Sequence, residues 1–182
     1  MIKKINVPYY SQYTNIKDEY WKPRACGALC LKMVLDFLVS VNFGQPSEIS
    51  KLSADDFVLF ANESGAYGPS GWIHQGLINI AEKFGIKMER KEFKDKLLLN
   101  GIKEIKKSLK TGKPVLVSVV KRFSEKDKFH MVVLTGYKSR FGFIKGFYYN
   151  DTDYQNAEDG KDLFVDTGTF RKYWRRLAIF VE

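Results

Sequence analysis

Apolar residues recur with a helical period through the first half of the chain. From Cys26 to Val39 they form a wide stripe that includes Leu29, Met33 and Phe37, a pattern typical of a helix with one buried face. The same spacing predicts three further helices, over residues 53–60, 73–84 and 102–109.

From Val115 onward the pattern changes to short β-branched and aromatic runs, which favour strands. These runs predict five strands, over residues 115–120, 130–137, 143–150, 163–165 and 177–181. A turn signal at residues 138–142 joins two of them as a hairpin, and Asp166 or Thr169 is expected to cap a one-turn helix that runs to Trp174. Helices followed by antiparallel strands indicate an α+β fold.

The chain has 182 residues, of which 45% are hydrophobic, and this is enough for a single domain over residues 1–182. No run approaches the ~20 apolar residues of a membrane span, and no apolar stretch follows the charged start at Lys3 and Lys4. We therefore expect no membrane span and no signal peptide, and either a cytoplasmic protein or a mature or excised domain.

The formal net charge of +9 suggests either an anionic partner or a solubilising surface. The lysines mostly alternate with acids, as in Lys87–Glu92, and this favours a solvated surface. The lysine-rich region also lacks interleaved aromatic residues, so we expect no nucleic-acid partner.

The two cysteines, Cys26 and Cys30, differ in their expected surroundings. Their spacing within one helix disfavours a disulfide, and with His74 and His130 they form no zinc-ligand pattern. Cys30 lies inside the apolar stripe and is expected to be structural. Cys26 stands at the start of the helix, where free N–H groups and the macrodipole favour a nucleophilic thiolate.

A reactive cysteine needs a base and a group that orients the base. His130 opens the strand at 130–137 and is preferred as the base over His74, which lies on a predicted helix. Asn150 and Asp151 both close the next strand, and because neighbouring strand residues point to opposite faces, only one of them can orient His130.

The order of these residues resembles that of papain-like cysteine peptidases, above all the double-glycine, bacteriocin-processing peptidase group. The segments that carry the resemblance are Val7–Gln12, Trp21, Cys26-Gly27, His130–Gly136 and Tyr148–Asp151. Two positions depart from that group's pattern: Ala25 replaces a charged residue before the cysteine, and Thr152 replaces a proline after the aspartate. No ATPase or membrane-spanning part follows the matched region.

The resemblance implies a two-lobed papain-like fold, in which an N-terminal helical lobe carries the cysteine helix against a C-terminal antiparallel sheet. It implies that Cys26 is the nucleophile, His130 the base and Asp151, rather than Asn150, the group that orients it. Gln12 and the Cys26 backbone N–H are expected to stabilise the oxyanion.

The expected activity is cleavage of a peptide bond through a thiol acyl-enzyme. We expect Gly27 to let a substrate carbonyl approach closely, and Gly71 and Trp72 to line the substrate groove, although Trp72 also fits a core position. A narrow groove near Gly71 would favour small residues such as glycine beside the cut. The expected partner is a peptide or protein substrate, with no metal or organic cofactor, and the chain is expected to be a monomer. Two other functions stay open: a thiol acyl-transferase and a catalytically silent peptide-binding module.

Overall fold

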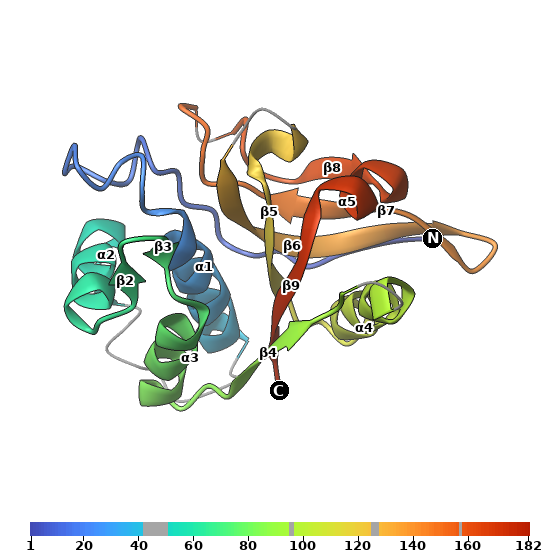
Figure 1. Ribbon diagram of the computed structural model, residues 1–182, viewed down its shortest axis with the longest axis horizontal. Helices are drawn as coiled ribbons and strands as arrows, with labels where there is room; N and C mark the ends of the chain where they lie inside the picture. Colours follow the sequence, from blue (N-terminus) through green and yellow to red (C-terminus); the bar gives the residue numbers. More distant parts are fainter. Residues whose placement is uncertain (42–50, 95–96, 125–127, 157) are drawn as a thin grey trace.

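Two lobes, one mainly helical and one built on a sheet, make up the protein (Figure 1). The computed structural model describes residues 1–41, 51–94, 97–124, 128–156 and 158–182. The helices in these ranges are α1 (Cys26–Ser40), α2 (Ala54–Glu63), α3 (His74–Lys83), α4 (Leu98–Lys110) and α5 (Thr167–Tyr173). The strands are β1 (Ile2–Lys4), β2 (Tyr67–Gly68), β3 (Gly71–Trp72), β4 (Met88–Glu92), β5 (Val115–Val120), β6 (Phe129–Arg140), β7 (Phe143–Asn150), β8 (Leu163–Asp166) and β9 (Trp174–Val181).

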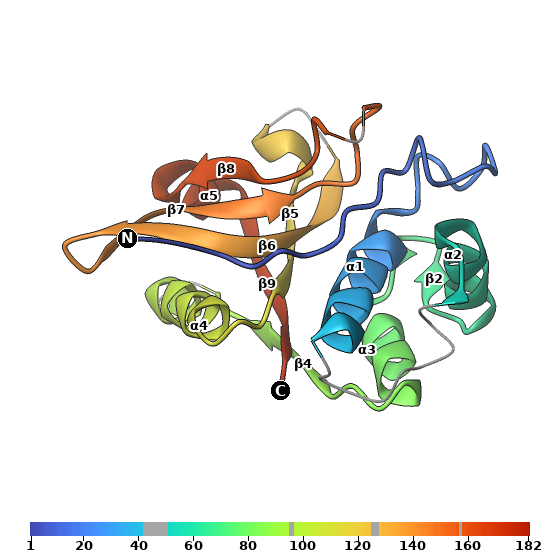
Figure 2. The same ribbon diagram turned by 180° about the vertical axis from the view of Figure 1, so that it is seen from behind.

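The sheet lobe is an antiparallel sheet with the strand order β4-β9-β5-β6-β7-β8. β1 pairs with the far end of the long strand β6, so the start of the chain lies along this strand (Figure 2). Gly136 permits the pairing, because a Cβ atom at this position would lie 2.3 Å from the carbonyl oxygen of Lys3. β6 therefore organises the sheet lobe, with partners in β1, β5 and β7.

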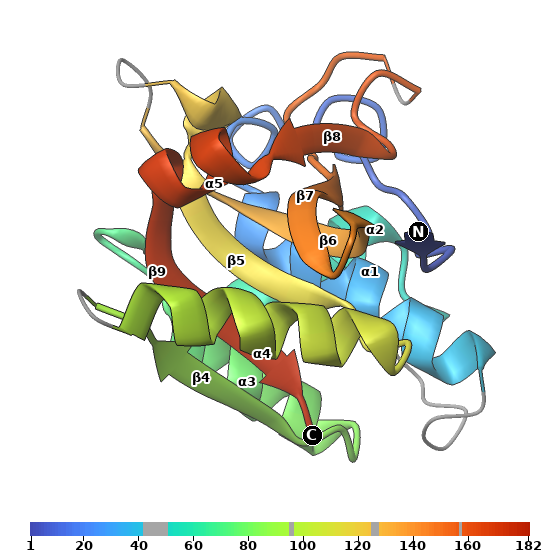
Figure 3. The ribbon, with the colours of Figure 1, turned by 90° about the vertical axis from the view of Figure 1, so that its right-hand side faces the viewer.

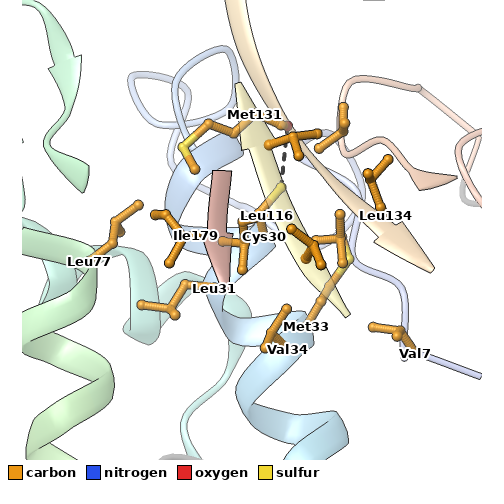
Figure 4. Packing of buried hydrophobic residues seen from close by; sticks show 14 of the residues in the cluster. Val7, Cys30, Leu31, Met33, Val34, Leu77, Leu116, Met131, Leu134 and Ile179 are labelled. Atoms are coloured by element: carbon orange, nitrogen blue, oxygen red, sulfur yellow. Dashed lines mark hydrogen bonds between the residues drawn. The ribbon is translucent and has the colours of Figure 1, made fainter. Parts of the chain in front are cut away.

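The helical lobe holds α1, α2, α3 and the small β2–β3 hairpin. α1 packs against β6, and α4 packs against β6 and β9 at another part of the sheet (Figure 3). Cys30 lies fully buried where α1 meets β6, and its thiol donates to the Met131 carbonyl oxygen at 3.3 Å (Figure 4). The apolar stripe of α1 thus joins the two lobes in one hydrophobic core.

The predicted α+β, two-lobed fold is confirmed. Each predicted helix and each of the five predicted strands is present, and Asp166, not Thr169, caps α5 by accepting from the backbone N–H groups of Gly168 and Thr169. β1, β2, β3 and β4 were not predicted. The alternating charges of Lys87–Glu92 belong mostly to β4, an edge strand whose side chains are largely exposed.

No helix in the described ranges is both long enough and apolar enough to cross a membrane.

A buried ion pair on α1 ties the helical lobe to the N-terminal segment. The Lys32 side chain is 2% exposed, and its Nζ lies 3.0 Å from Asp36 Oδ2, one helical turn away. Tyr10 donates its hydroxyl to the same oxygen at 2.6 Å, and the Lys32 ammonium also lies over the rings of Tyr10 and Phe57. A buried lysine is tolerated only with such partners, because burial of an isolated charge is very costly.

We predict that Asp36→Ala lowers the free energy of unfolding by about 3–5 kcal/mol, because it leaves the buried Lys32 charge without this carboxylate. Lys32→Met removes the charge and keeps most of the volume, so its cost is expected to stay within about 1 kcal/mol. Urea denaturation of both variants measures the difference. A Lys32→Met cost as large as that of Asp36→Ala would contradict the assignment of the loss to a buried charge deprived of its Asp36 partner.

Candidate active site

Cys26 is the first residue of α1, and the fold places it opposite the start of β6. Its backbone N–H belongs to the first turn and therefore has no acceptor within the helix. The side chain is half-buried and interacts with His130 by charge and by a side-chain hydrogen bond. The Met131 backbone also supplies a hydrogen bond to the Cys26 sulfur. The thiol thus faces the imidazole predicted to be its base.

His130 is held by a buried carboxylate. Its Nε2 lies 2.6 Å from Asp151 Oδ1, and both side chains are almost fully buried. Because Nε2 is used for Asp151, Nδ1 is the ring nitrogen left for Cys26. The structure therefore brings Cys26, His130 and Asp151 into one thiol–imidazole–carboxylate chain.

The charges of this chain favour a thiolate–imidazolium pair. Burial raises the pKa of Cys26, but the charge and hydrogen bond of His130 and the Met131 backbone outweigh it, so the net pKa is lowered. Burial lowers the pKa of His130, whereas Cys26 and Asp151 raise it, and the result is a pKa of about 10. The pKa of Cys30 is raised well above the ordinary value, first by burial and then by the neighbouring Cys26. The lowered pKa favours the thiolate of Cys26, whereas the raised pKa keeps Cys30 a thiol.

Asp151 is held by hydrogen bonds from the backbone of Asp153 and from the side chain of Tyr9. Its Oδ1 also accepts from the Asp153 backbone N–H at 2.9 Å, and its carbonyl oxygen accepts from the Tyr9 hydroxyl at 2.9 Å. Burial raises the pKa of Asp151, but His130, the Asp153 N–H and Arg122 lower it overall. The carboxylate therefore stays ionised beside the imidazole.

Asn150 points elsewhere, as expected for the neighbouring residue on a strand. Its Oδ1 accepts from the Asp162 backbone N–H at 3.0 Å, which holds the loop after β7. Asp151, not Asn150, contacts His130.

Gln12 is buried, and both ends of its amide group have defined partners. Oε1 accepts from the Thr152 hydroxyl at 2.6 Å, and Nε2 donates to the Lys22 carbonyl oxygen at 2.7 Å. A carbonyl can only accept, so the orientation of the amide follows from the Lys22 contact. Among the described residues, no hydrogen bond joins Gln12 to Cys26, and Gln12 does not line the groove beside Cys26. Its oxyanion role stays a prediction.

A groove of about 450 Å³ opens beside Cys26. Gly71 and Trp72 line it, and their role in substrate binding stays a prediction. Trp72 also supports the start of α1: its Nε1 donates to the Arg24 carbonyl oxygen at 2.5 Å, and a Cβ atom at Gly27 would lie 2.4 Å from Trp72 Cγ. Gly27 therefore makes room for the indole ring, which differs from the expectation that it opens space for a substrate carbonyl.

His74 lies in the same groove but contacts a different partner. Its Nε2 is 3.0 Å from the hydroxyl of Ser118, and its pKa is lowered, first by burial and then by Arg90 and Arg175. His74 is therefore neutral at physiological pH and is engaged between α3 and β5. In the described ranges, no group of three or more histidine, cysteine or acidic side chains is placed to bind a metal ion.

The sequence analysis missed Thr152, Asp153, Ser118 and the cations of the groove, Arg24, Lys128 and Arg175. Thr152 and Asp153 follow directly after the predicted Asp151, so their proximity to the site was available as a signal. The positions of Ser118 and Arg175 depend on strand pairing across the sheet, for which no local motif exists.

Residues 4–178 match the Peptidase C39-like family. A search of curated proteins gives no match.

Three solved structures illustrate the structural similarity. A C39-like peptidase from Bacillus anthracis is 21% identical, with 99% of this chain and 97% of that chain covered and a TM-score of 0.66. A double-glycine motif protease from an AMS/PCAT transporter, in complex with the leader peptide, is 17% identical over 98% and 94% of the two chains, with a TM-score of 0.57. The peptidase domain of Streptococcus ComA, a bifunctional ABC transporter, is 18% identical over 98% and 96%, with a TM-score of 0.55. These likenesses show a shared fold. Since the family match spans nearly all of the chain, the protein belongs to the Peptidase C39-like family and has its papain-like cysteine-peptidase fold.

Proposed function

We propose that this protein is a cysteine peptidase that cleaves peptide bonds through an acyl-enzyme. The observation that carries the proposal is the assembled chain of Cys26, His130 and Asp151 at the edge of a groove. A nucleophile, a base and an orienting carboxylate in this order are the parts that acyl transfer needs.

The reaction follows from the charges of the site. The Cys26 thiolate attacks the scissile carbonyl carbon and forms a tetrahedral oxyanion. The imidazolium of His130 then gives its proton to the leaving amine as the C–N bond breaks. Water attacks the thioester, passes a proton back through His130 and releases the acid, while Asp151 keeps the imidazole oriented.

A peptide substrate with glycine beside the cut is the substrate that the site supports best. Gly71 and Trp72 form one part of the groove wall, and the bulky Trp72 ring in this wall favours a small residue beside the cut. The relative from an AMS/PCAT transporter was solved with a leader peptide, which supports a peptide ligand for this fold. A silent binding module is less well supported, because such a module has no need of an activated thiol.

Gln12 and the Cys26 backbone N–H donate to the oxyanion in this proposal. The Gln12 amide carries two N–H bonds, and the Lys22 carbonyl uses one of them. Thr152 acts as a positioning residue, because its hydroxyl holds Oε1 and so turns the amide nitrogen in a fixed direction. The residue that replaces the usual proline after the aspartate thus has a role beyond its turn.

The first prediction concerns the reactivity of the two cysteines. We expect iodoacetamide to modify Cys26 at about pH 5–6, because its thiolate persists well below the free pKa of about 8.5, while Cys30 stays unmodified. His130→Ala is expected to move the Cys26 pKa toward that free value. Mass spectrometry of the protein alkylated across a pH series measures both. Equal labelling of Cys26 and Cys30, or an unchanged Cys26 pKa in His130→Ala, would contradict the ion pair.

The second prediction concerns turnover. We expect an acyl-Gly-Gly coumarylamide to be hydrolysed by the wild-type protein, and Cys26→Ala to lose this activity entirely, because no other thiol reaches the groove. Cys30→Ala serves as the matched control and is expected to keep it. The rate of fluorescence release measures hydrolysis, and circular dichroism checks that each variant is folded. Activity retained by Cys26→Ala would overturn the nucleophile assignment. Adding an amine nucleophile reports acyl transfer as a second product.

The third prediction separates the oxyanion donors from the thiolate. Acylation of Cys26 by 4-nitrophenyl acetate passes through an oxyanion, whereas alkylation by iodoacetamide does not. We expect Gln12→Ala to lower the ratio of acylation to alkylation by about 10²–10³-fold. Thr152→Val should lower it by up to about tenfold, and Thr152→Ser should restore it.

The ratio distinguishes positioning from general damage, because a misfolded site slows both reactions together. An unchanged ratio in Gln12→Ala would remove Gln12 from the oxyanion site. An unchanged ratio in Thr152→Val alone would remove only the positioning role of Thr152.

A further inference from the structure

Three cations line the groove beside Cys26: Arg24, Lys128 and Arg175. In the described part of the chain, no aspartate or glutamate lines this groove, and none of the three cations has an ion pair with a carboxylate. The basic residues of β4 behave differently, since Arg90 and Lys91 pair with Glu92, Glu89 and Glu104. Positive charge is therefore neutralised on the outer strand and left uncompensated in the groove.

Arg175 is placed in the groove by an irregularity of β9. Ser118 on β5 pairs with Leu177, whereas the next residue, Val119, pairs with Trp174. Arg175 and Arg176 are thus extra residues that form a bulge, and Arg176 has a φ of 63°. A left-handed conformation at a residue other than glycine is costly. Bulges often redirect a side chain beside a functional site.

The bulge holds the Arg175 guanidinium over the ring of Phe129, with its Cζ 3.4 Å from the ring centroid. Phe129 directly precedes His130 in the sequence. Stacking on an aromatic ring fixes the plane of the guanidinium and leaves its N–H groups at the edge free to donate. Arg175 is exposed on β9, and partial burial by its surroundings lowers the pKa of its guanidinium. A guanidinium held in place over a ring, with no carboxylate partner among the described residues, is placed to bind an anionic ligand.

Arg24 lines the groove from the segment before α1, two residues before Cys26. It donates to the Tyr20 carbonyl oxygen at 2.7 Å, and its guanidinium lies 4.2 Å from the centroid of the Tyr20 ring. The two arginines therefore come from the two lobes, one from the segment before α1 and one from β9, and both have a set orientation.

We propose that the groove selects peptides that carry carboxylate side chains near the bond to be cut, with Arg175 as the main residue that binds them and Arg24 and Lys128 in support. Charge complementarity favours this occupant, because a planar guanidinium binds a carboxylate through two hydrogen bonds. Cleavage of the bound peptide rests on the proposed function. The preference for carboxylate side chains is a binding property and does not depend on turnover.

The test uses the full chain with Cys26→Ala, which binds without cleaving. Two rhodamine-labelled twelve-residue peptides with a central Gly-Gly differ only in flanking Glu or Gln residues on both sides. Fluorescence anisotropy is expected to give at least about tenfold tighter binding of the Glu peptide at 0.1 M salt. The preference should fall to less than about twofold at 1 M salt, where the Debye length is about 3 Å.

Arg175→Gln is expected to remove most of the preference, and Arg24→Gln part of it. The matched control is Arg171→Gln on the exposed surface of α5. This variant loses one positive charge, as Arg175→Gln does, and is expected to keep the preference for the Glu peptide. Equal affinity for the Glu and Gln peptides would overturn the proposal. So would a preference that is unaffected by Arg175→Gln.

A nucleic-acid ligand is the competing outcome. Tighter binding of the oligonucleotide (dT)12 than of the Glu peptide, lost in Arg175→Gln, would overturn the peptide proposal. Failure of the peptidase hypothesis alone would give a different result. The wild-type protein would then bind the Glu peptide selectively but leave it uncut, and Cys26 would show no alkylation near pH 5–6.

Discussion

The buried hydrogen bond between His130 and Asp151 is the interaction on which the site depends. A carboxylate with 1% exposure needs strong partners, and His130 Nε2 and the Asp153 N–H supply them to a single oxygen. This bond commits one nitrogen of the imidazole and so determines which nitrogen meets Cys26. The sheet produces the contact, because β6 and β7 run antiparallel with Val133 opposite Asn150, which brings the start of one strand beside the end of the other. Because neighbouring residues point to opposite faces, the Asp151 side chain meets His130 and the Asn150 side chain points away from it.

The N-terminal segment links this sheet geometry to the cysteine helix. Tyr9 contacts the Asp151 backbone, Gln12 contacts Thr152, and Tyr13 donates to the Asp153 carboxylate. The Gln12 amide also donates to the carbonyl oxygen of Lys22, which lies shortly before the start of α1. The tripeptide Asp151–Asp153 therefore holds His130 and also positions the segment that leads to Cys26. Asp153 is itself held by Lys121 and Arg122, so the support extends to the end of β5.

The sequence predicted those parts of the molecule that local periodicity determines. The α1 stripe, the β-branched run of β5 and the aromatic run of β7 each bury a regular face, and their bounds were close to the observed ones. β1 and β4 were missed, because edge strands present charged side chains to solvent and carry no apolar alternation. The contacts among Cys26, His130 and Asp151 agree with the order of residues along the chain, but their catalytic roles stay predictions. Gly27 shows where local reasoning fails: the space beside it is occupied by Trp72, a residue 45 positions away in the sequence, and no local pattern reports that contact.

In the proposed function, activation of the thiol and selection of the substrate depend on different charges. The principal groups that set the Cys26 pKa, after burial, are His130, the Met131 backbone and Asp151. The cations Arg24, Lys128 and Arg175 are not among these groups, although they line the same groove. The resting thiolate, imidazolium and carboxylate together carry one net negative charge, and Arg122, which lowers the Asp151 pKa, lies on the side of the Asp153 network. The groove cations are therefore not consumed in stabilising the resting site. In our proposal their charge stays available to an anionic ligand, because the lowered pKa of Cys26 arises mainly from His130 and the Met131 backbone.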